Sequence, residues 1–270
     1  MTAWSYDVTA EFYDQDMGRN TDGRDVAWYV AEAGRAVAAL GGSVVEMGCG
    51  TGRVTLALAA EGLRVIAMDR SVPMLRVLIR KAAAAGFRRQ IQPVAANMSR
   101  PGLARRFAAI LCPYSAFGYL TEADERGRML AGVRDSLAPG GVLLLDMFIP
   151  DPTLDGLPNG AEIHDYHRAL PPGPWAPAVM LARSKRLTRL RPGVNRIERR
   201  YRFFDGAGGL VREVWTQSDV RLYTSETLQE VLTEAGFTDQ QVCGDFDRAL
   251  PGAPPARVTV VTARLKRSLE

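Results

Sequence analysis

The chain has 270 residues, of which 47% are hydrophobic and 24% are charged. This composition is typical of a folded, enzyme-sized protein, and it excludes the disordered, collagen-like and membrane classes. The formal net charge of +4 is carried by 31 arginines and 3 lysines scattered along the chain, a pattern that indicates a solvated surface and no nucleic-acid partner.

The cysteines and the first residues bear on where the protein works. Cys49, Cys112 and Cys243 have no metal-ligand spacing, and an odd count favours a reducing compartment. The first fifteen residues lack the basic start and apolar run of a secretory signal, and the longest apolar runs are too short to cross a bilayer. We therefore expect a cytoplasmic protein with no membrane partner.

Helical and strand-like patterns alternate between residues 24 and 148. Asp22-Gly23 precede a helical apolar spacing that ends at Gly41-Gly42, and Ser71 and Thr121 are expected to cap later helices. Further helices are expected at 53–61, 71–86 and 122–137, and strands at 43–47, 63–68, 91–95, 107–112 and 142–148. This alternation predicts a parallel, doubly wound α/β sheet that binds ligands at the carboxyl ends of its strands.

After residue 149 the pattern changes to a proline-rich loop followed by alternating, strand-like runs. We expect a meander at 179–190, 195–204 and 210–222 with a hairpin turn at 205–209, then a helix over 224–235 capped by Thr224 and an antiparallel strand pair at 240–245 and 257–263. The expected domains are a core with an N-terminal helical lid at 1–149, an inserted substrate wall at 150–222, and the end of the core sheet at 223–270.

A glycine-rich turn follows the first strand. Gly48 and Gly50 let a ligand approach the backbone and permit positive φ, while the next helix offers free N–H groups to a carboxylate. Glu46 suits a cationic amino group, so the turn predicts a site for an amino acid that carries both charges. A nicotinamide-binding loop is the alternative, but it requires G-x-G-x-x-G spacing, whereas G-x-G-x-G stands here.

Polar residues at the next strand ends extend this site. Asp69 ends the second strand, where a carboxylate can accept hydrogen bonds from ribose hydroxyls. The Asn97 amide after the third strand suits the exocyclic amine of adenine, and Met98 or Met74 can pack on the ring. Together with the glycine turn, these positions predict a nucleoside that carries an amino-acid tail.

The chain resembles the class I S-adenosylmethionine-dependent methyltransferases through E-x-G-x-G-x-G at 46–52, the acid at Asp69 and L-A-P-G-G at 137–141. The resemblance covers roughly 6–148 and, more loosely, 224–237. It implies a Rossmann-like seven-stranded sheet with an antiparallel C-terminal strand, S-adenosylmethionine as the cofactor, and a β-rich insertion that acts as a substrate lid. Where the family often has Asp-Met after the third strand, this chain has Asn97-Met98.

Two further segments resemble the small-molecule branch, which includes amino-sugar and glycine N-methyltransferases: S-Y-D-V-T-A-E-F-Y-D at 5–14 and P-Y-S-A-F-G-Y-L at 113–120. In those enzymes the tyrosine that corresponds to Tyr13 lies over the cofactor. We expect cofactor contacts from Tyr13, Arg24, Glu46, Gly48, Cys49, Gly50, Asp69, Arg70, Met74, Asn97, Met98, Cys112 and Phe117. A surface role for Arg24 is left open.

The candidate catalytic residues are Tyr13, Tyr119 and His164. Phe117 and Tyr119 can face a cationic sulfonium, although Tyr119 can equally be a packed aromatic. His164 and His167 lie on a predicted loop, where solvent exposure, a base, or a metal site with Glu162 are the alternatives; we expect exposure and no metal.

The predicted function is methyl transfer to a nitrogen or oxygen of a small molecule, as in natural-product biosynthesis. Cys112-Pro113-Tyr114 lacks the amide or acid of the Asn/Asp-Pro-Pro-Tyr motif, which argues against methylation of a planar exocyclic nitrogen. The alternatives are a C-methyltransferase acting on an activated carbon, an NAD-dependent oxidoreductase and a non-catalytic cofactor-binding regulator. The expected partner is a small-molecule substrate, and a homodimer is left open.

Overall fold

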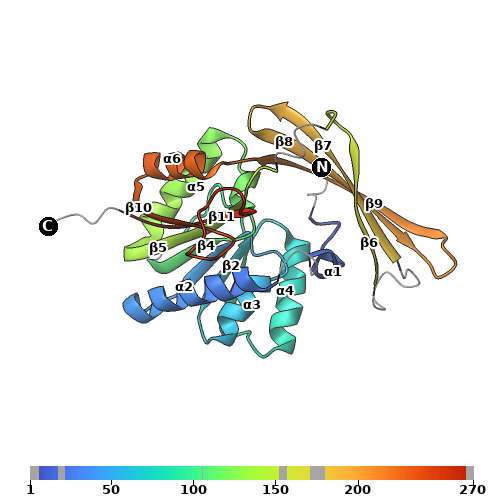
Figure 1. The fold of residues 1–270 in the computed structure, drawn as a ribbon. Helices are drawn as coiled ribbons and strands as arrows, with labels where there is room; N and C mark the ends of the chain where they lie inside the picture. The colour runs from blue at the N-terminus through green and yellow to red at the C-terminus, as the bar shows by residue number, and fades with distance from the viewer. Residues whose placement is uncertain (1–5, 18–21, 105, 152–156, 171–179, 266–270) are drawn as a thin grey trace. The chain divides into compact units, whose positions relative to one another are not determined.

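The computed structural model describes residues 6–17, 22–104, 106–151, 157–170 and 180–265. The chain divides into two compact units. The core unit comprises Thr21–Pro150 and Leu222–Glu270, and the insert unit comprises Met1–Asn20 and Asp151–Arg221. Figure 1 shows the elements of both.

The core unit is built on a seven-stranded sheet with the order β10-β11-β5-β4-β1-β2-β3. All neighbouring strands are parallel except that β11 runs antiparallel to both β5 and β10. The strands are β1 (Val44–Met47), β2 (Val65–Asp69), β3 (Ile91–Ala95), β4 (Phe107–Cys112), β5 (Leu137–Phe148), β10 (Phe237–Gly244) and β11 (Val258–Leu265). The prediction of a doubly wound sheet with an antiparallel C-terminal strand is confirmed.

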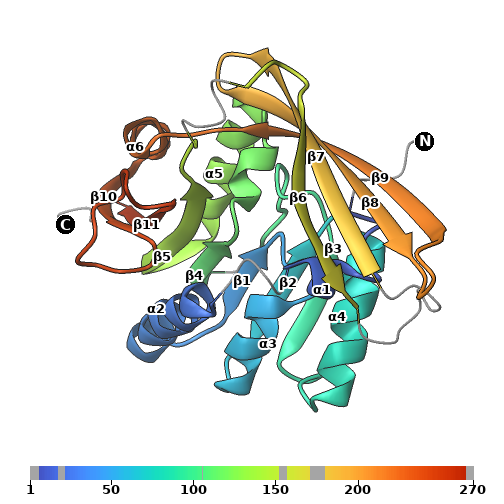
Figure 2. The same ribbon diagram turned by 45° about the vertical axis from the view of Figure 1, so that its right-hand side comes forward.

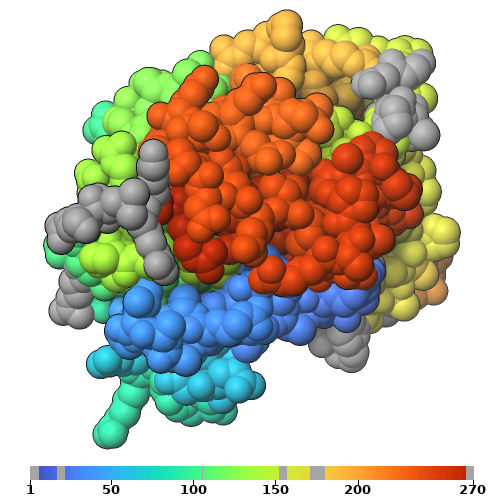
Figure 3. All heavy atoms as spheres, turned by 60° about the vertical axis from the view of Figure 1, so that its left-hand side comes forward, coloured from blue at the N-terminus to red at the C-terminus, as the bar shows by residue number. Residues whose placement is uncertain are grey.

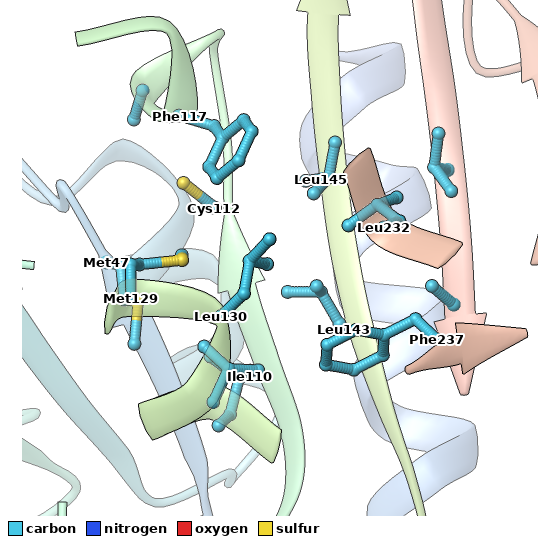
Figure 4. Packing of buried hydrophobic residues seen from close by; sticks show 14 of the residues in the cluster. Met47, Ile110, Cys112, Phe117, Met129, Leu130, Leu143, Leu145, Leu232 and Phe237 are labelled. Atoms are coloured by element: carbon cyan, nitrogen blue, oxygen red, sulfur yellow. The ribbon is translucent and has the colours of Figure 1, made fainter. Parts of the chain in front are cut away.

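Helices cover both faces of this sheet (Figure 2). One face packs against α2 (Arg24–Leu40), α3 (Arg53–Ala60) and α4 (Val72–Ala84), and the other against α5 (Ala123–Ser136) and α6 (Ser225–Glu234). Since β1 and β4 are buried at every position, apolar residues occupy both of their faces. Figure 4 shows part of the core on the α5 and α6 side.

The segment between β10 and β11 lies along α2 (Figure 3). The Phe246 ring packs edge-on against Trp28 with 5.9 Å between ring centres. Arg248 pairs with the buried carboxylate of Glu32, which also binds Arg35. These contacts hold the segment between β10 and β11 against α2.

The insert unit is a four-stranded antiparallel sheet with the order β6-β7-β8-β9. Its strands are β6 (Glu162–Ala169), β7 (Met180–Arg191), β8 (Val194–Phe204) and β9 (Leu210–Arg221). The hairpin at 205–209 forms as predicted, and the Asp205 carboxylate accepts the N–H groups of Ala207 and Gly209. The loop expected around His164 was wrong, because that segment pairs with β7 to form the fourth strand, β6.

The described N-terminal residues belong to the insert unit. Phe12, just before α1 (Tyr13–Met17), packs its ring 5.1 Å from Tyr201 and 5.0 Å from Phe203. The Asp16 carboxylate binds the Arg183 guanidinium at 2.7 Å. The expected grouping of this segment with the core at 1–149 is therefore corrected, since a buried ion pair and an aromatic cluster join it to the insert.

Within the described residues, no helix has both the length and the apolar character needed to span a membrane.

Candidate functional site

The glycine turn at the carboxyl end of β1 is the centre of the site. Gly48, Gly50 and Gly52 adopt φ values of 73°, 54° and 88°, all in the left-handed region that favours glycine. The N–H groups of Gly48 and Cys49 both donate to the Met68 carbonyl, at 2.8 Å and 3.0 Å. The turn is thereby tied to the end of the neighbouring strand β2.

Two of these glycines also leave no room for a side chain. A Cβ on Gly48 would lie 3.0 Å from the Cβ of Ala116, and a Cβ on Gly52 would lie 2.2 Å from the Cδ1 of Leu78. Through Ala116, η1 (Ala116–Tyr119) packs against the turn, and through Leu78, α4 packs against Gly52 at the start of α3. The glycines are therefore needed for two reasons: their φ values are positive, and neighbouring side chains lie where a Cβ would be.

Glu46 is a buried acid beside the turn, with 2% of its surface exposed. Burial raises the pKa of its carboxyl to about 7, against the opposing effects of the Thr55 hydroxyl and the Arg53 charge. Thr55 on α3 is its one hydrogen-bond donor among the described residues. A carboxylate can accept several such bonds, so Glu46 has acceptor capacity left for a cation.

Asp69 ends β2 and holds the turn from the other side. Its Oδ2 accepts the Gly50 N–H at 2.8 Å, and its Oδ1 accepts the Ser71 N–H at 2.8 Å. Burial raises the pKa of this carboxyl, while the backbone donors act against the shift. The Arg70 N–H is a third backbone donor to this carboxyl. A carboxylate has about four acceptor sites, so Asp69 keeps capacity for a hydroxyl, which fits its predicted role at the ribose.

The other residues predicted around the nucleoside differ in exposure. Asn97 is exposed after β3, and its Oδ1 accepts the Ser99 N–H at 3.0 Å. Met98 is half-buried against the core, Arg70 is exposed, and Met74 is 1% exposed inside α4's packed face. The structure therefore gives Met74 a packing role, and its contact with a cofactor stays a prediction.

The loop after β4 joins the strand to η1. Cys112 is fully buried, and burial raises the pKa of its thiol, as it does for Cys49. Phe117 is fully buried as well; its ring centre lies 5.6 Å from that of Tyr223, and Figure 4 shows it among the core residues. Tyr119 on the same short helix is half-buried. Of the two aromatics proposed to face a sulfonium, Phe117 thus packs in the core.

Comparison with known proteins bears on this arrangement. Residues 44–141 match the family described as "Methyltransferase domain", a range that starts at β1 and ends within β5. The chain carries a class I S-adenosylmethionine-dependent methyltransferase domain. The domain thus contains the glycine turn, the acids Glu46 and Asp69, and the loop after β4.

Individual relatives match different shares of this chain. The chain is 32% identical over 110 residues to a cypemycin N-terminal methyltransferase of a Streptomyces species, a match that spans 41% of this chain and 43% of that protein. It is 26% identical over 262 residues to the dTDP-4-amino-2,3,4,6-tetradeoxy-D-glucose N,N-dimethyltransferase of Saccharopolyspora spinosa, which covers 94% of this chain and 92% of that protein.

The fold of the whole chain also has a solved counterpart. An S-adenosylmethionine-dependent methyltransferase from Clostridium acetobutylicum superimposes with a TM-score of 0.77 and 15% identity, over 97% of this chain and 99% of that one. The core unit and the insert unit therefore both have counterparts in a known methyltransferase fold.

The residues of the methyltransferase domain fit S-adenosylmethionine. Glu46 is a buried carboxyl with spare acceptor capacity for the cofactor's amino group. Asp69 accepts backbone N–H groups on both oxygens and keeps acceptor capacity for a ribose hydroxyl. The turn also leads into the first N–H groups of α3, which suit the cofactor's carboxylate.

Of the other predicted site residues, Tyr13 and His164 belong to the insert unit, and Arg24 belongs to the core unit. Tyr13 belongs to the insert unit, where its half-buried ring lies 5.8 Å from that of Tyr6. Arg24, at the start of α2, is exposed and binds Asp22. His164 is exposed on β6, and its ring centre lies 5.8 Å from that of His167.

The faces of the insert sheet separate His164 from α1. His164 pairs with Ser184, whereas the next residue along β7, Arg183, binds Asp16 of α1. Consecutive strand residues point to opposite faces, so His164 faces away from the side that α1 covers. In the described part of the chain, no group of three or more His, Cys, Asp or Glu side chains could hold a metal ion.

Sequence reasoning missed three residues of this region: Thr55, Tyr29 and Asp146. Thr55 binds Glu46 across the turn, and Tyr29 donates to the Oδ1 of Asp146 at 2.6 Å. A signal for Asp146 was present, because it is a lone charged residue in the apolar run V-L-L-L-D-M-F of β5. A charge on a fully covered strand needs partners, and those partners come from distant segments.

Proposed function

We propose that the protein transfers methyl groups from S-adenosylmethionine to an amino nitrogen of a small molecule, with a nucleotide-linked amino sugar as the first substrate class to test. The observation that carries this proposal is the match with the Saccharopolyspora spinosa N,N-dimethyltransferase, because it spans 94% of the chain and so includes the insert unit. The insert unit's residues 151–221 lie outside the family match at 44–141, and we propose that they select the substrate.

The core residues would hold the cofactor by complementary charge and hydrogen bonding. Glu46 would bind the amino group, Asp69 the ribose hydroxyls, and the first N–H groups of α3 the carboxylate. When bound, S-adenosylmethionine supplies a methyl group whose bond to sulfur breaks as the bond to the substrate nitrogen forms, while the nitrogen releases a proton to water. The protein's task is to align the amine and exclude water.

An amine is favoured over a hydroxyl because the loop after β4, residues 113–120, contains no Asp, Glu or His side chain to act as a base. The residues 112–114 are Cys-Pro-Tyr, and the buried Cys112 thiol has a raised pKa that keeps it protonated. An amine that arrives unprotonated needs no such base, whereas a hydroxyl gains from one. For Tyr119 we propose a contact with the substrate, and for Tyr13 the cover over the cofactor that the resemblance implies. The exposure of His164 favours its solvent-facing interpretation over a role as base.

The test combines binding with product analysis. Titration calorimetry with S-adenosylmethionine and with NAD should show binding of the former alone. Incubation with nucleotide-linked amino sugars, simple amines, phenols and activated carbon acids should then give methylated products, identified by mass spectrometry, for the amino sugars. Methylation of a phenol oxygen or a carbon instead would overturn the choice of nitrogen, and binding without turnover across the panel would favour a regulator.

For the compartment, the cysteines support a reducing environment, the cytoplasm. Cys49, Cys112 and Cys243 are all buried and unpaired. A disulfide-forming compartment would threaten such thiols whenever the chain unfolds. A homodimer stays a prediction that light scattering of the purified protein would test.

A further inference from the structure

The loop after β4 holds two consecutive residues in an unfavourable backbone conformation. Tyr114 and Ser115 have φ values of 57° and 56°, in the left-handed region. Residues with a Cβ pay a free-energy cost there, and such conformations persist only where the surroundings impose them. Neither residue is a glycine, asparagine or aspartate, so the cause must lie in their contacts.

The contacts come from the buried carboxylate of Asp146, which is 2% exposed at the carboxyl end of β5. Its Oδ1 accepts the Tyr114 N–H at 2.7 Å, and its Oδ2 accepts the Ser115 N–H at 3.2 Å. The Tyr29 hydroxyl on α2 donates to the same Oδ1 at 2.6 Å. The Ser115 hydroxyl in turn accepts the Phe148 N–H at 2.7 Å, so both ends of the turn are fixed to β5.

The loop held in this way borders the glycine turn. Ala116, the residue after Ser115, is so close to Gly48 that a Cβ on the glycine would lie 3.0 Å from its own Cβ. The Arg53 guanidinium at the start of α3 lies 5.6 Å from the centre of the Tyr114 ring and binds Asp25. The position of the loop therefore sets one wall of the turn where we place the cofactor.

We propose that Asp146 is a positioning residue for methyl transfer: by accepting the N–H groups of Tyr114 and Ser115, it sets the loop after β4 against the Gly48 turn. It need not touch the cofactor or the substrate. The inference rests on the proposed function only in taking the glycine turn as the cofactor site. The competing interpretation is that Asp146 is a core hydrogen-bond partner whose loss would lower stability alone.

Two isosteric variants separate these interpretations. Asp146→Asn keeps the shape of the side chain but turns one of its two acceptors into a donor, so one loop N–H loses its partner. Tyr29→Phe removes the third hydrogen bond to the same carboxylate and leaves both loop bonds in place. We expect both variants to melt at a lower temperature than the wild type, while S-adenosylhomocysteine binding weakens about tenfold in Asp146→Asn and stays within about twofold in Tyr29→Phe.

Two substitutions at Ser115 examine the loop directly. Glycine occupies positive φ without the Cβ penalty, so Ser115→Gly added to Asp146→Asn should recover part of the lost affinity. Ser115→Val places a β-branched residue at φ 56° with Asp146 intact, and it should weaken binding as Asp146→Asn does. It also serves as the test if Asp146→Asn does not fold. Amide hydrogen exchange of the peptide 113–120, measured without ligand, should be faster in Asp146→Asn and in Ser115→Val than in the wild type.

The outcomes distinguish this inference from the proposed function. If the wild type binds neither S-adenosylmethionine nor S-adenosylhomocysteine, the proposed function fails, and the inference fails with it. If the wild type binds and Asp146→Asn binds equally well despite a lower melting temperature, only the inference is overturned. Equal weakening by Tyr29→Phe, with unchanged exchange of 113–120, would also overturn it.

Discussion

At the scale of single residues, two aspartates perform the same backbone task in different places. Asp69 accepts the N–H groups of Gly50 and Ser71, and Asp205 accepts those of Ala207 and Gly209 in the insert hairpin. Only Asp69 lies at the carboxyl end of a parallel strand, where ligands bind in such sheets. The pair therefore allows the cost of a lost turn to be separated from the cost of a lost ligand contact.

We expect Asp69→Ala to weaken S-adenosylmethionine binding by about 1 to 3 kcal/mol, because the ribose hydroxyls lose their acceptors and the turn loses a brace. Asp205→Ala should leave the dissociation constant unchanged, while it loosens its own hairpin. Titration calorimetry on both variants gives the comparison. Unchanged binding by Asp69→Ala would show that the ribose lies elsewhere.

Glu46 makes cofactor binding depend on pH. Its pKa is raised to about 7 by burial, so near neutral pH part of the free protein carries a protonated carboxyl. The amino group of the cofactor favours the ionised form, and binding should therefore release a proton from Glu46. Affinity should accordingly rise from pH 6 to pH 7.5.

Calorimetry in buffers of different ionisation enthalpy measures this proton release directly. The wild type should release a fraction of a proton per cofactor bound at pH 6.5. Glu46→Gln cannot titrate and should bind more weakly, with the release lost. A release that persists in Glu46→Gln would assign the proton to another group, of which Asp69 is the nearest candidate because its charge acts on Glu46.

At the scale of elements, two helix starts show how a local signal can mislead. On α6 the Thr224 hydroxyl accepts the Thr227 N–H at 3.2 Å and the Thr227 hydroxyl accepts the Thr224 N–H at 3.0 Å, which forms a capping box. On α5 the expected cap at Thr121 was wrong, because Glu122 takes the N-cap position and Thr121 bonds to its side chain instead.

Thr224→Ala should therefore lower the free energy of unfolding by about 1 kcal/mol, the usual contribution of a cap, whereas Thr121→Ala should change it by no more than a few tenths. Chemical denaturation of the two variants, followed by circular dichroism, checks the difference. Equal losses would mean that Thr121 caps α5 in solution despite its geometry here.

The strands show which elements the sequence could predict. β3 and β4 lie at their predicted bounds. β4 is covered on both faces and shows as a continuous apolar run, whereas β3 is a mostly exposed edge strand. β6 was missed because its residues are mostly polar and show no strand pattern. Its strand conformation depends on pairing with β7, and the local sequence does not show that pairing. The same holds for α1, whose partners on the insert sheet lie far along the chain.

The site follows the same division. Glu46, the glycines and Asp69 could be predicted because strand, turn and helix follow one another within a short segment, so spacing alone places them. The role of Thr55 could not be predicted, because it depends on the approach of Thr55 to the buried Glu46 carboxylate. The sequence marks Asp146 as a lone charge in β5, but it does not show which groups bind that charge. Spacing predicted a nucleoside with an amino-acid tail, the family resemblance named the cofactor, and the supporting contacts needed the fold.

At the scale of the whole molecule, buried acids set how stability responds to pH. Burial raises the pKa of Asp146 to about 6 and that of Glu46 to about 7, both above their ordinary values of 3.8 and 4.5. Between the unfolded and folded pKa values the folded protein binds more protons than the unfolded chain. Unfolding then releases protons, and the free energy of unfolding falls as pH rises through this range.

The exposed acids act in a different range. Arginines lower the pKa values of Asp124 and Asp219, and the Trp215 indole N–H followed by Arg200 lowers that of Glu213. Their contribution is therefore present above pH 5 and is lost only in stronger acid. Between pH 5 and pH 8 the buried carboxyls of Glu46 and Asp146 should therefore dominate, and Asp69, whose pKa burial also raises, acts in the same direction. Each pKa unit corresponds to about 1.4 kcal/mol, so the decrease over this window should be on the order of 2 to 4 kcal/mol.

We expect the ligand-free protein to melt at a progressively lower temperature from pH 5 to pH 8, measured by differential scanning calorimetry at constant ionic strength. Glu46→Gln removes the buried carboxyl with the pKa of about 7 and should flatten the upper part of the curve, between pH 6 and pH 8. Saturating S-adenosylmethionine should flatten the same part in the wild type, because it pairs the Glu46 charge that burial penalises. A melting temperature that rises with pH over this window would mean that neither acid is protonated in the folded protein.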